Sequence, residues 1–334
     1  MLKKELQNLL NRNYYLDDGI LYLDKNSKGY WSNLDKEENE ELINLLKQYN
    51  SRKLIKEKYN WLYEIIYSPK RLAGLELLEL TGEEVCVDYG CMWGSIAIGL
   101  SKICACVLGI DQTKNSLEFL KKRILEEKID NLFLLNTNLH NQINFDNFFD
   151  ISIVNGVLEW IPETNEIELK KYFGKKQNKE YKISNNPKKM QEQFLKMVYN
   201  NLKHNGKLYL AIENRFDFKC MLGHKDPHSN IRFTSIFPRK ISDLFSYIFL
   251  SRKYVNWLYS FDEIKYLLEN IGFKNIELFM VFPDYRFPEK IIPYNKRLTK
   301  NEIANFFLKE YTNKCFYKKK LASIYSNIIS KIIN

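Results

Sequence analysis

Two acidic residues and a glycine-containing turn form the clearest chemical pattern in this chain. Residues Val85–Ser95 read VCVDYGCMWGS, an apolar strand that runs into a turn with Gly90 and Gly94. Glycine is required where a backbone bends tightly and a ligand approaches it closely. A second apolar run ends at Asp111, about 20 residues past the turn, where a carboxylate can accept hydrogen bonds from two ribose hydroxyls. This spacing predicts a ribose-containing ligand at the carboxyl ends of two neighbouring strands.

Histidine and aspartate residues lie together in a later segment that has no clean periodicity. His224, Asp226 and His228 alternate with other residues on what we expect to be an irregular loop. Histidine suits a general base near neutral pH, and a carboxylate can orient it. We take His228 as the first candidate base, His224 as the second and Asp226 as the orienting group, and a surface loop histidine is as plausible. The same residue types suit a metal, but no further strong ligand is evident, so we predict none.

Short apolar strands alternate with helices around these residues. Strands are predicted at Val85–Asp88, Cys106–Ile110, Leu132–Leu135, Ile151–Val154 and Lys207–Ile212, and helices at Ser95–Lys102, Asn115–Lys128 and Pro187–Leu202. This alternation is typical of crossover units in a doubly wound, mostly parallel sheet covered by helices on both faces. Gly206 is expected to end the last of these helices in a left-handed C-cap. We therefore predict an α/β fold whose ligands bind beyond the carboxyl ends of the strands.

The flanking segments are less regular. Residues 1–80 are predicted to be mostly helical, with Asp35 as a helix cap. Residues 163–186 are polar and rich in lysine, and residues 214–256 carry aromatic, proline and histidine residues without a helical or strand period. A further helix is expected at Phe261–Ile271 and a further strand at Ile276–Phe282.

The composition is that of a folded protein with a substantial core. Its 334 residues are 45% hydrophobic and include 21 Phe, 22 Tyr and 5 Trp, which excludes global disorder. The net charge of +10 favours anionic partners, although lysines spread along the whole chain also suit a solvated basic face. Six Cys without a C-x-x-C pair suit free thiols in a reducing cytoplasm. We expect no membrane span and no secretory leader, because no long apolar run or signal-like start is present.

The turn resembles motif I of the class I S-adenosylmethionine-dependent methyltransferases, which is typically D-x-G-x-G-x-G followed by a helix. Asp88 matches the acidic start, Gly90 the first glycine and Gly94 the third, while Met92 replaces the middle glycine. The G-x-G-x-x-G pattern of nicotinamide-binding folds is absent. The resemblance implies a Rossmann-like fold with S-adenosyl-L-methionine as the cofactor.

The resemblance continues in order along the chain. Asp111, with Gln112 beside it, matches the ribose-binding acid, and Asn138 falls where these enzymes often place an Asp or Asn against the adenine amino group. Residues 149–162 look like the family's fourth strand and the turn that follows it. The cofactor-binding residues implied in this way are Asp88, Gly90, Cys91, Gly94, Asp111, Gln112, Asn138 and Asn155.

The downstream half resembles bacterial methyltransferases associated with cell-surface polysaccharide and lipopolysaccharide synthesis, often beside or fused to glycosyltransferases. The segments that carry this likeness are 211–216, 223–228, 233–235, 259–260 and 282–285. The likeness implies a hydroxyl acceptor on a glycan, nucleotide sugar or lipid-linked sugar, and glycosyltransferases of the same pathway as partners. The residues expected to face the acceptor are Glu159, Glu213, Asn214 and Arg215.

Some of these roles have structural alternatives. Glu159 could instead cap a helix, and Arg215 could either hold a phosphate or carboxylate of the acceptor or close a loop through a salt bridge. The aromatic segment 245–259 could be a lid over the acceptor or a helix packed on the sheet. The family's antiparallel seventh strand is not evident in residues 320–329, so that strand is either degenerate or replaced by a helix.

Three domains follow from these patterns. We expect a helical extension at 1–80, a methyltransferase domain at 81–295 with an acceptor-binding insertion at about 214–256, and a basic helical tail at 296–334. The tail could lie on an anionic membrane or dock a partner, so the expected location is the cytoplasm, with peripheral contact to the inner face of the membrane through the tail.

Two other function classes compete with a glycan methyltransferase. A methyltransferase or binding protein for tRNA or rRNA would use the positive charge, but no appended RNA-binding motif or dense lysine block is present, so nucleic acid is disfavoured. A catalytically silent scaffold of a glycan assembly complex would fit Met92 in the glycine turn.

Overall fold

The computed structural model describes residues 15–23, 32–140, 143–163, 186–221, 223–226, 228–251, 253–296, 299 and 302. Predictions for the lysine-rich segment 164–185, for the stretch 320–329 and for most of the basic tail lie outside these residues. The chain divides into two compact units, Met1–Lys274 and Asn275–Asn334. The second unit begins at Asn275, before the predicted tail at 296–334. The predicted domain limits stay predictions.

A seven-stranded sheet forms the centre of the first unit. Its order is β1-β2-β5-β4-β3-β6-β7, and neighbouring strands are parallel except for the antiparallel pair β1–β2. The five predicted strands are present as β3 (Val85–Tyr89), β4 (Cys106–Asp111), β5 (Leu132–Asn136), β6 (Phe149–Asn155) and β7 (Leu202–Ala211). The strand order reverses at β3, which lies between β4 and β6. The predicted α/β fold with a doubly wound, mostly parallel sheet is confirmed.

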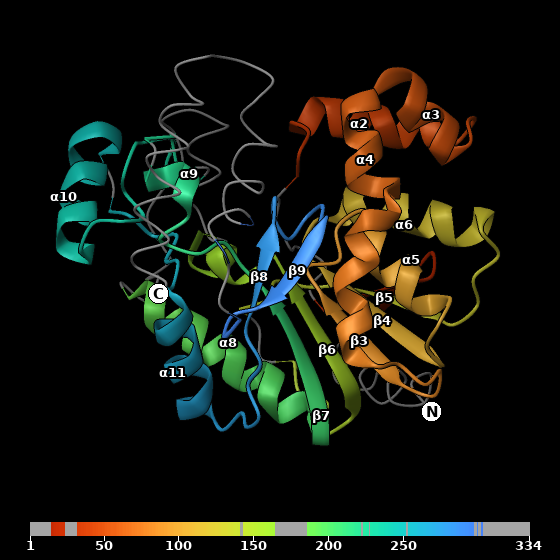
Figure 1. The fold of residues 1–334 in the computed structure, drawn as a ribbon. Coiled ribbons are helices and arrows are strands. Elements are labelled where there is room, and N and C mark those ends of the chain that lie inside the picture. The colour runs from red at the N-terminus through yellow and green to blue at the C-terminus, as the bar shows by residue number, and fades with distance from the viewer. Residues whose placement is uncertain are drawn as a thin grey trace. The chain divides into compact units, whose positions relative to one another are not determined.

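Helices cover both faces of this sheet (Figure 1). One face carries α5 (Ser95–Ser101) and α6 (Lys114–Glu126), and the other carries α8 (Pro187–Asn201) and α11 (Phe261–Ile271). Every residue of β3 is buried, as expected for a parallel strand between two layers of helices. The capping box at the start of α11 and Gly272 at its end fix the limits that the sequence predicted for that helix.

The N-terminal extension contributes strands as well as helices. β1 (Tyr15–Asp17) and β2 (Ile20–Tyr22) form a hairpin, and β2 extends the sheet by pairing in parallel with β5. The expectation of a mostly helical extension missed this hairpin, because so short an edge strand depends on the free edge of β5 more than on its own sequence. Asp35 caps the first helix in a capping box with Glu38, as predicted. The helical elements are α2 (Lys36–Leu46), α3 (Ser51–Lys58), α4 (Asn60–Tyr67) and the 3-10 segment η1 (Pro69–Leu78).

The junction between α8 and β7 differs from the prediction of a glycine C-cap. Helix α8 ends at Asn201, its C-cap residue Leu202 has extended backbone angles, and the left-handed residue is Asn205, with φ 64°. Gly206 is required for space, because a Cβ there would lie 3.0 Å from the carbonyl oxygen of Lys203 and 3.1 Å from that of Asp150. Gly206 therefore allows two backbone segments to approach closely inside the sheet, and it does not end the helix.

Shorter elements complete the two units. The first unit also contains the 3-10 segment η2 (Leu158–Glu163) and the helices α9 (Phe218–Met221) and α10 (Arg239–Leu250), and the second contains the strands β8 (Phe279–Phe282) and β9 (Lys290–Pro293). β8 and β9 form a separate antiparallel pair, so the described part of the large sheet holds no antiparallel strand next to β7. No helix within the described ranges is long and apolar enough to cross a lipid bilayer.

The glycine at the start of α5 provides a test of the packing beneath the turn. Gly94 has φ 79°, and a Cβ on it would lie 2.1 Å from Leu120 Cδ1, whereas Gly82 has φ 100° and its Cβ would meet nothing closer than 3.4 Å. Left-handed strain costs an alanine about 1–2 kcal/mol at either position. Overpacking adds about 1–3 kcal/mol at Gly94 alone.

We therefore expect Gly94→Ala to lower the free energy of unfolding by about 2–5 kcal/mol and the control Gly82→Ala to lower it by about 1–2 kcal/mol. Urea denaturation followed by circular dichroism measures both losses. Equal losses in the two variants would show that Leu120 does not limit the space at the turn.

Candidate functional site

The turn after β3 is packed too closely for a side chain at Gly90. A Cβ there would lie 2.6 Å from Val157 Cγ2, and φ is 72°. The amides of Gly90 and Cys91 donate to the carbonyl of Ile110 at 2.8 and 3.0 Å, which holds the turn against the end of β4. The side chain of Cys91 is buried and faces Gly109, so this residue can offer only backbone groups to a ligand.

Met92 takes the place of the middle glycine with a left-handed backbone. Its φ is 49°, a conformation that costs a non-glycine residue about 1–2 kcal/mol. Two contacts offset this cost. The amide of Met92 donates to Asp111 Oδ2 at 2.9 Å, and the Met92 side chain packs against the apolar cluster of α2, α3 and α4. The other carboxylate oxygen of Asp111 accepts the amide of Thr113 at 2.7 Å, so one side chain joins the turn to the start of α6.

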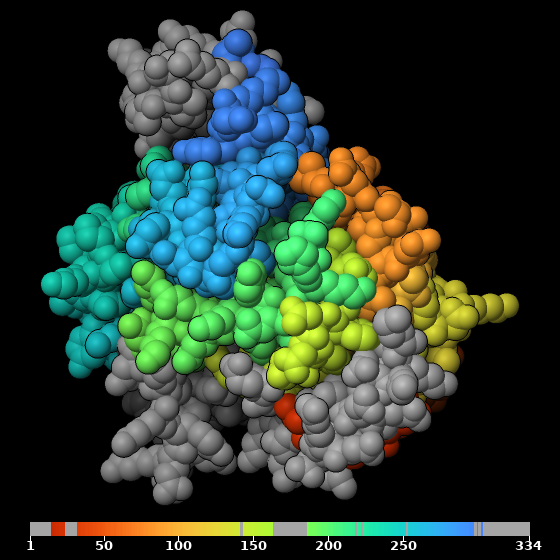
Figure 2. Space-filling model, turned by 90° about the horizontal axis from the view of Figure 1, so that it is seen from below, coloured from red at the N-terminus to blue at the C-terminus, as the bar shows by residue number. Residues whose placement is uncertain are grey.

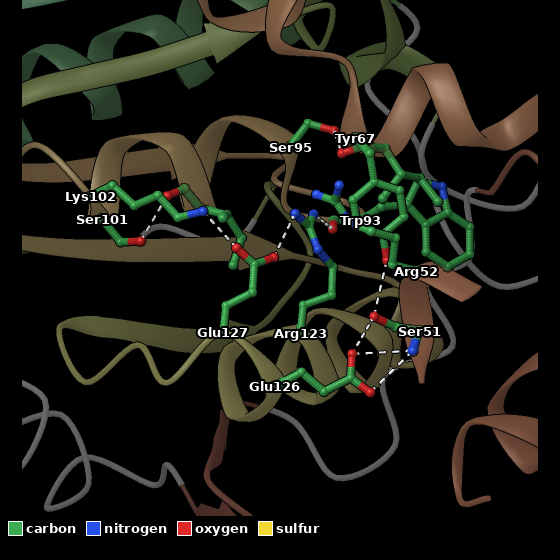
Figure 3. A network of polar contacts seen from close by, with 12 residues as sticks. Ser51, Arg52, Tyr67, Trp93, Ser95, Ser101, Lys102, Arg123, Glu126 and Glu127 are labelled. Carbon is green, nitrogen blue, oxygen red and sulfur yellow. Dashed lines mark hydrogen bonds and ion pairs between the residues drawn. The ribbon is translucent and has the colours of Figure 1, made fainter. Parts of the chain in front are cut away.

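A polar network joins the N-terminal helices to the same turn (Figure 3). Arg123 of α6 donates to the carbonyl of Trp93 at 2.9 Å, and its guanidinium lies 4.6 Å from the ring centroid of Tyr67 at the end of α4. Ser95 donates to the carbonyl of Ile65 at 2.7 Å. The extension is therefore part of the wall of the site, because α4 fixes the residues on both sides of Gly94.

Two buried carboxyl groups end neighbouring strands beside the turn. Burial raises the pKa of Asp88 to about 7, opposed by the charge of Arg71 and reinforced by that of Asp111. Burial likewise raises the pKa of Asp111 to about 6, opposed by hydrogen bonds from the amides of Thr113 and Met92. The negative charge of Asp111 thus disfavours the ionisation of Asp88. Well above pH 7 both are ionised, and the site then favours hydroxyl donors and positive charge.

Two amide side chains predicted to contact the cofactor carry buried oxygen atoms with no hydrogen-bond partner among the described residues. These atoms are Gln112 Oε1, directly after β4, and Asn155 Oδ1, the last residue of β6. A buried acceptor without a donor costs about 1–3 kcal/mol, so both positions suit a ligand that donates. The third amide, Asn138, accepts the amide of His140 at 2.9 Å and stabilises the turn after β5.

Three acidic and basic side chains from separate segments meet beyond the carboxyl ends of β6 and β7. Glu159 lies in η2, Glu213 follows β7 and His228 lies in the insertion. One ligand atom of each lies within 4.8 Å of the others. Glu159 and His228 are buried and Glu213 is partly buried, with His228 Nε2 3.9 Å from Glu213 Oε2. The structure thus brings together three residues that the sequence assigned to the acceptor side.

Asp226 holds the loop that carries His228. Its Oδ1 accepts the amides of His228 and Ser229 at 2.9 and 2.7 Å and lies 3.7 Å from His228 Nδ1, while its Oδ2 accepts the hydroxyl of Tyr254 at 3.1 Å. Burial opposes the ionisation of Asp226, but the interactions with His228 and the two amides outweigh it and hold the pKa of Asp226 below its usual range. His224 is exposed and lies outside this cluster.

Two further residues expected at the acceptor have contacts that close the insertion. The guanidinium of Arg215 is buried, pairs with Glu263 at 2.8 Å and donates to the carbonyl of Phe237 at 2.9 Å. These are the contacts of the loop-closing alternative. Asn214 Oδ1 accepts the amide of Phe216 at 2.8 Å and turns the chain away from β7.

Sequence reasoning missed Asn136 and Trp160. Asn136 is the last residue of β5, and its Nδ2 donates to the carbonyls of Asp111 and Gln112 at 3.1 and 3.0 Å. The sequence signal for Asn136 was an amide side chain at the end of the predicted strand that follows Asp111. Trp160 packs its ring 4.8 Å from that of His228, a contact with no sequence signal because the two lie in different segments.

The cluster of Glu159, Glu213 and His228 could also ligate a divalent cation. Two carboxylates and an imidazole are suitable ligands, and a carboxylate behind the histidine, here Asp226, is common in metal sites. This set differs from the histidines and aspartate that the sequence suggested, because His224 is not a member.

Residues 87–170 match a family model described as a methyltransferase domain. No curated protein matches the sequence. Solved structures with a similar chain path include the YcgJ protein of Bacillus subtilis (11% identity, TM-score 0.40, covering 75% of this chain and 87% of that one). A possible histamine N-methyltransferase of Thermotoga maritima is similar at 15% identity and TM-score 0.43, covering 72% of this chain and 90% of that one.

A third similar structure is phosphoethanolamine N-methyltransferase 2 of Haemonchus contortus with S-adenosylhomocysteine (13% identity, TM-score 0.44, 85% of this chain and 57% of that one). At this level of likeness we transfer neither an acceptor nor a mechanism from any of the three. The strand order, the glycine turn and the buried amide oxygens all fit a nucleoside-containing methyl donor. Residues 87–170 are thus a methyltransferase domain, and its methyl donor is S-adenosylmethionine.

Proposed function

We propose that the chain methylates a hydroxyl oxygen on a sugar of a bacterial surface glycan, or on its nucleotide-linked or lipid-linked precursor. The observation that carries a hydroxyl acceptor is the buried His228 between Asp226 and Glu213, beyond the ends of β6 and β7. A hydroxyl has a high pKa and needs a base beside it as it reacts, whereas a more acidic acceptor does not. The choice of a sugar is supported by the likeness of the downstream segments to polysaccharide-associated methyltransferases.

The donor side of the site would hold the nucleoside through groups already in place. Asp111 presents a carboxylate for two ribose hydroxyls while it continues to hold the amides of Met92 and Thr113. The amide oxygens of Gln112 and Asn155 offer acceptors to donors of the cofactor. S-adenosylmethionine supplies a methyl carbon attached to a sulfonium, which is reactive toward a nucleophile in line with the breaking bond.

The acceptor side would supply alignment and a base. Asp226 lies on the Nδ1 side of His228, so Nε2 is the nitrogen that would take the proton of the acceptor hydroxyl. Glu213 lies 3.9 Å from this nitrogen and Glu159 belongs to the same cluster, so both carboxylates would stabilise the imidazolium that forms. Trp160 packs on the imidazole and restricts its rotation. Holding two reactants in line is the larger part of catalysis in such a transfer. A buried, packed histidine would hold the acceptor hydroxyl in a fixed position for it.

The competing functions predict different binding behaviour. An RNA methyltransferase would bind tRNA with an affinity that falls steeply as salt is raised, since phosphate contacts release counterions. A silent scaffold would bind no S-adenosylmethionine. Calorimetric titration of the purified chain with S-adenosylmethionine, and then with tRNA at two salt concentrations, separates these outcomes from the proposed one.

The protonation of Asp111 should make cofactor binding depend on pH. Because its pKa is about 6, Asp111 is protonated below that pH and then loses acceptors for the ribose hydroxyls. We expect the affinity for S-adenosylmethionine to be constant above pH 7 and to weaken by up to about tenfold for each pH unit below 6. Asp111→Asn should weaken binding at pH 8 by tenfold or more, about 1.4 kcal/mol, and should remove most of this pH dependence.

Calorimetry between pH 5 and pH 8 measures these affinities, with circular dichroism to check folding. Asp130→Asn, at an exposed position, is the matched control and should behave as the unmodified chain. If Asp111→Asn kept both the affinity and its pH dependence, the ribose role of Asp111 would be wrong.

The proposed base can be removed without touching the donor site. His228→Gln should lower the rate of methyl transfer by about 10²–10⁴-fold and leave the affinity for S-adenosylmethionine within twofold, because the imidazole acts on the acceptor. The exposed His224 supplies the control His224→Gln, which should leave the rate unchanged. The assay follows S-adenosylhomocysteine release with nucleotide sugars, lipid-linked sugars and tRNA as acceptors.

Chelation distinguishes a base from a metal ligand at the same position. A rate that survives EDTA and falls in His228→Gln supports the base. A rate that EDTA abolishes and Mg²⁺ or Mn²⁺ restores would instead assign Glu159, Glu213 and His228 to a cation and contradict the proposed role of the histidine.

A further inference from the structure

Helix α10 buries polar residues and exposes apolar ones, the reverse of an ordinary surface helix. Its fully buried residues are Ser242 and Ser246, and Ser242 donates to the carbonyl of Thr234 at 2.6 Å. Its exposed face carries large apolar side chains with exposed fractions of 38–64%, namely Ile241, Leu244, Tyr247, Ile248, Phe249 and Leu250. A surface helix of a globular protein normally buries its apolar stripe and exposes its polar one. The reversed arrangement indicates that the apolar face is meant to be covered.

The apolar face continues onto the loop that precedes the helix. Phe233 is 38% exposed and contacts Phe237, with ring centroids 6.2 Å apart. Phe237 contacts Phe245 at 5.3 Å, and Phe245 contacts Phe249 at 6.3 Å. The aromatic rings therefore form one continuous surface from the loop to the last turn of α10. We call this surface, from residue 233 to residue 250, the α10 face.

The α10 face projects from the first unit. Figure 1 shows α10 at the edge of the unit away from α2, α3 and α4, and Figure 2 shows the same segment, in teal, standing out from the surface. A large contiguous apolar patch on the surface of a globular protein marks a site that binds another protein, a membrane or a ligand.

The residues around the α10 face are basic. Lys240 lies in the first turn of the helix, Lys253 three residues past its end and Arg232 beside Phe233, all three of them exposed. Asp243 is the single acidic residue within the helix. An apolar stripe with aromatic residues and a basic rim is the pattern of helices that lie in the plane of an anionic membrane surface.

A second copy of the chain fits this face less well. In a two-fold contact the same surface meets itself, so the basic rims of the two copies would come together, and the chain carries a net charge of +10. Like charges facing one another across an interface oppose association. An anionic bilayer satisfies the apolar residues and the basic rim at once.

We propose that the α10 face docks the protein on an anionic lipid bilayer. The first turn of α10 is tied to the segment that also carries His228, through Ser242 and through Arg239, whose guanidinium lies 4.6 Å from the ring centroid of Trp257. Docking would therefore hold the acceptor side of the site near lipid headgroups. That consequence rests on the proposed function and would favour a lipid-linked acceptor, whereas docking itself does not depend on it.

Vesicle flotation of the full-length chain tests the proposal. The chain should float with vesicles of phosphatidylglycerol and phosphatidylethanolamine and not with vesicles of phosphatidylcholine alone, and raising the salt concentration should weaken the binding. The double variant Leu244→Ser with Ile248→Ser should reduce the bound fraction by tenfold or more. Its affinity for S-adenosylmethionine, measured in solution without lipid, should not change, since neither residue belongs to the donor site.

A matched double variant controls for surface serines in general. Leu125 on α6 and Tyr266 on α11 are 65% and 64% exposed, so Leu125→Ser with Tyr266→Ser removes comparable exposed apolar area elsewhere. This control should float as the unmodified chain does. Failure of the unmodified chain to float would overturn the proposal. Flotation of the Leu244→Ser, Ile248→Ser variant would also overturn it, because the chain would then bind the vesicles through another surface. A dimer in light scattering that this variant dissociates, without vesicle binding, would overturn it in favour of a second copy.

Discussion

The carboxylate of Asp111 is the group on which the arrangement of the donor site depends. It accepts the amide of Met92 on one oxygen and that of Thr113 on the other, so it joins the turn after β3 to the start of α6. The first of these bonds helps Met92 to hold a left-handed backbone that only glycine adopts without strain. The residue that would bind the ribose therefore also shapes the turn that would receive the rest of the cofactor.

The N-terminal extension completes this arrangement from outside the methyltransferase domain. Its helices bury Trp93 in an apolar cluster against which the partly buried Met92 packs, and the backbone of α4 accepts the hydroxyl of Ser95. Arg123 of α6 donates to the carbonyl of Trp93 in the same turn. Packing thus holds a turn in which Met92 stands at the position of the middle glycine. The presence of Met92 is therefore compatible with an intact donor site.

The insertion after β7 has two different surfaces. Its inner side presents His228, held by Asp226, to the ends of the strands, and its outer side presents the apolar residues of α10. Arg215 joins this segment to α11 through Glu263 and binds the carbonyl of Phe237 within the segment itself, so one buried side chain ties both parts of the insertion to α11. One segment thus carries both the proposed base and the proposed docking face.

The sequence by itself determined the parallel strands, the helix limits set by Asp35 and Gly272, and the donor turn, because apolar runs, caps and glycine positions act within a few neighbouring residues. It also named Glu159, Glu213 and His228 one by one. Only the tertiary structure decided that these three meet, that residues 15–22 join the edge of β5, and that α10 turns its apolar side outward. Each of those outcomes depends on which distant segment lies opposite, and a local pattern of residues carries no information about that partner.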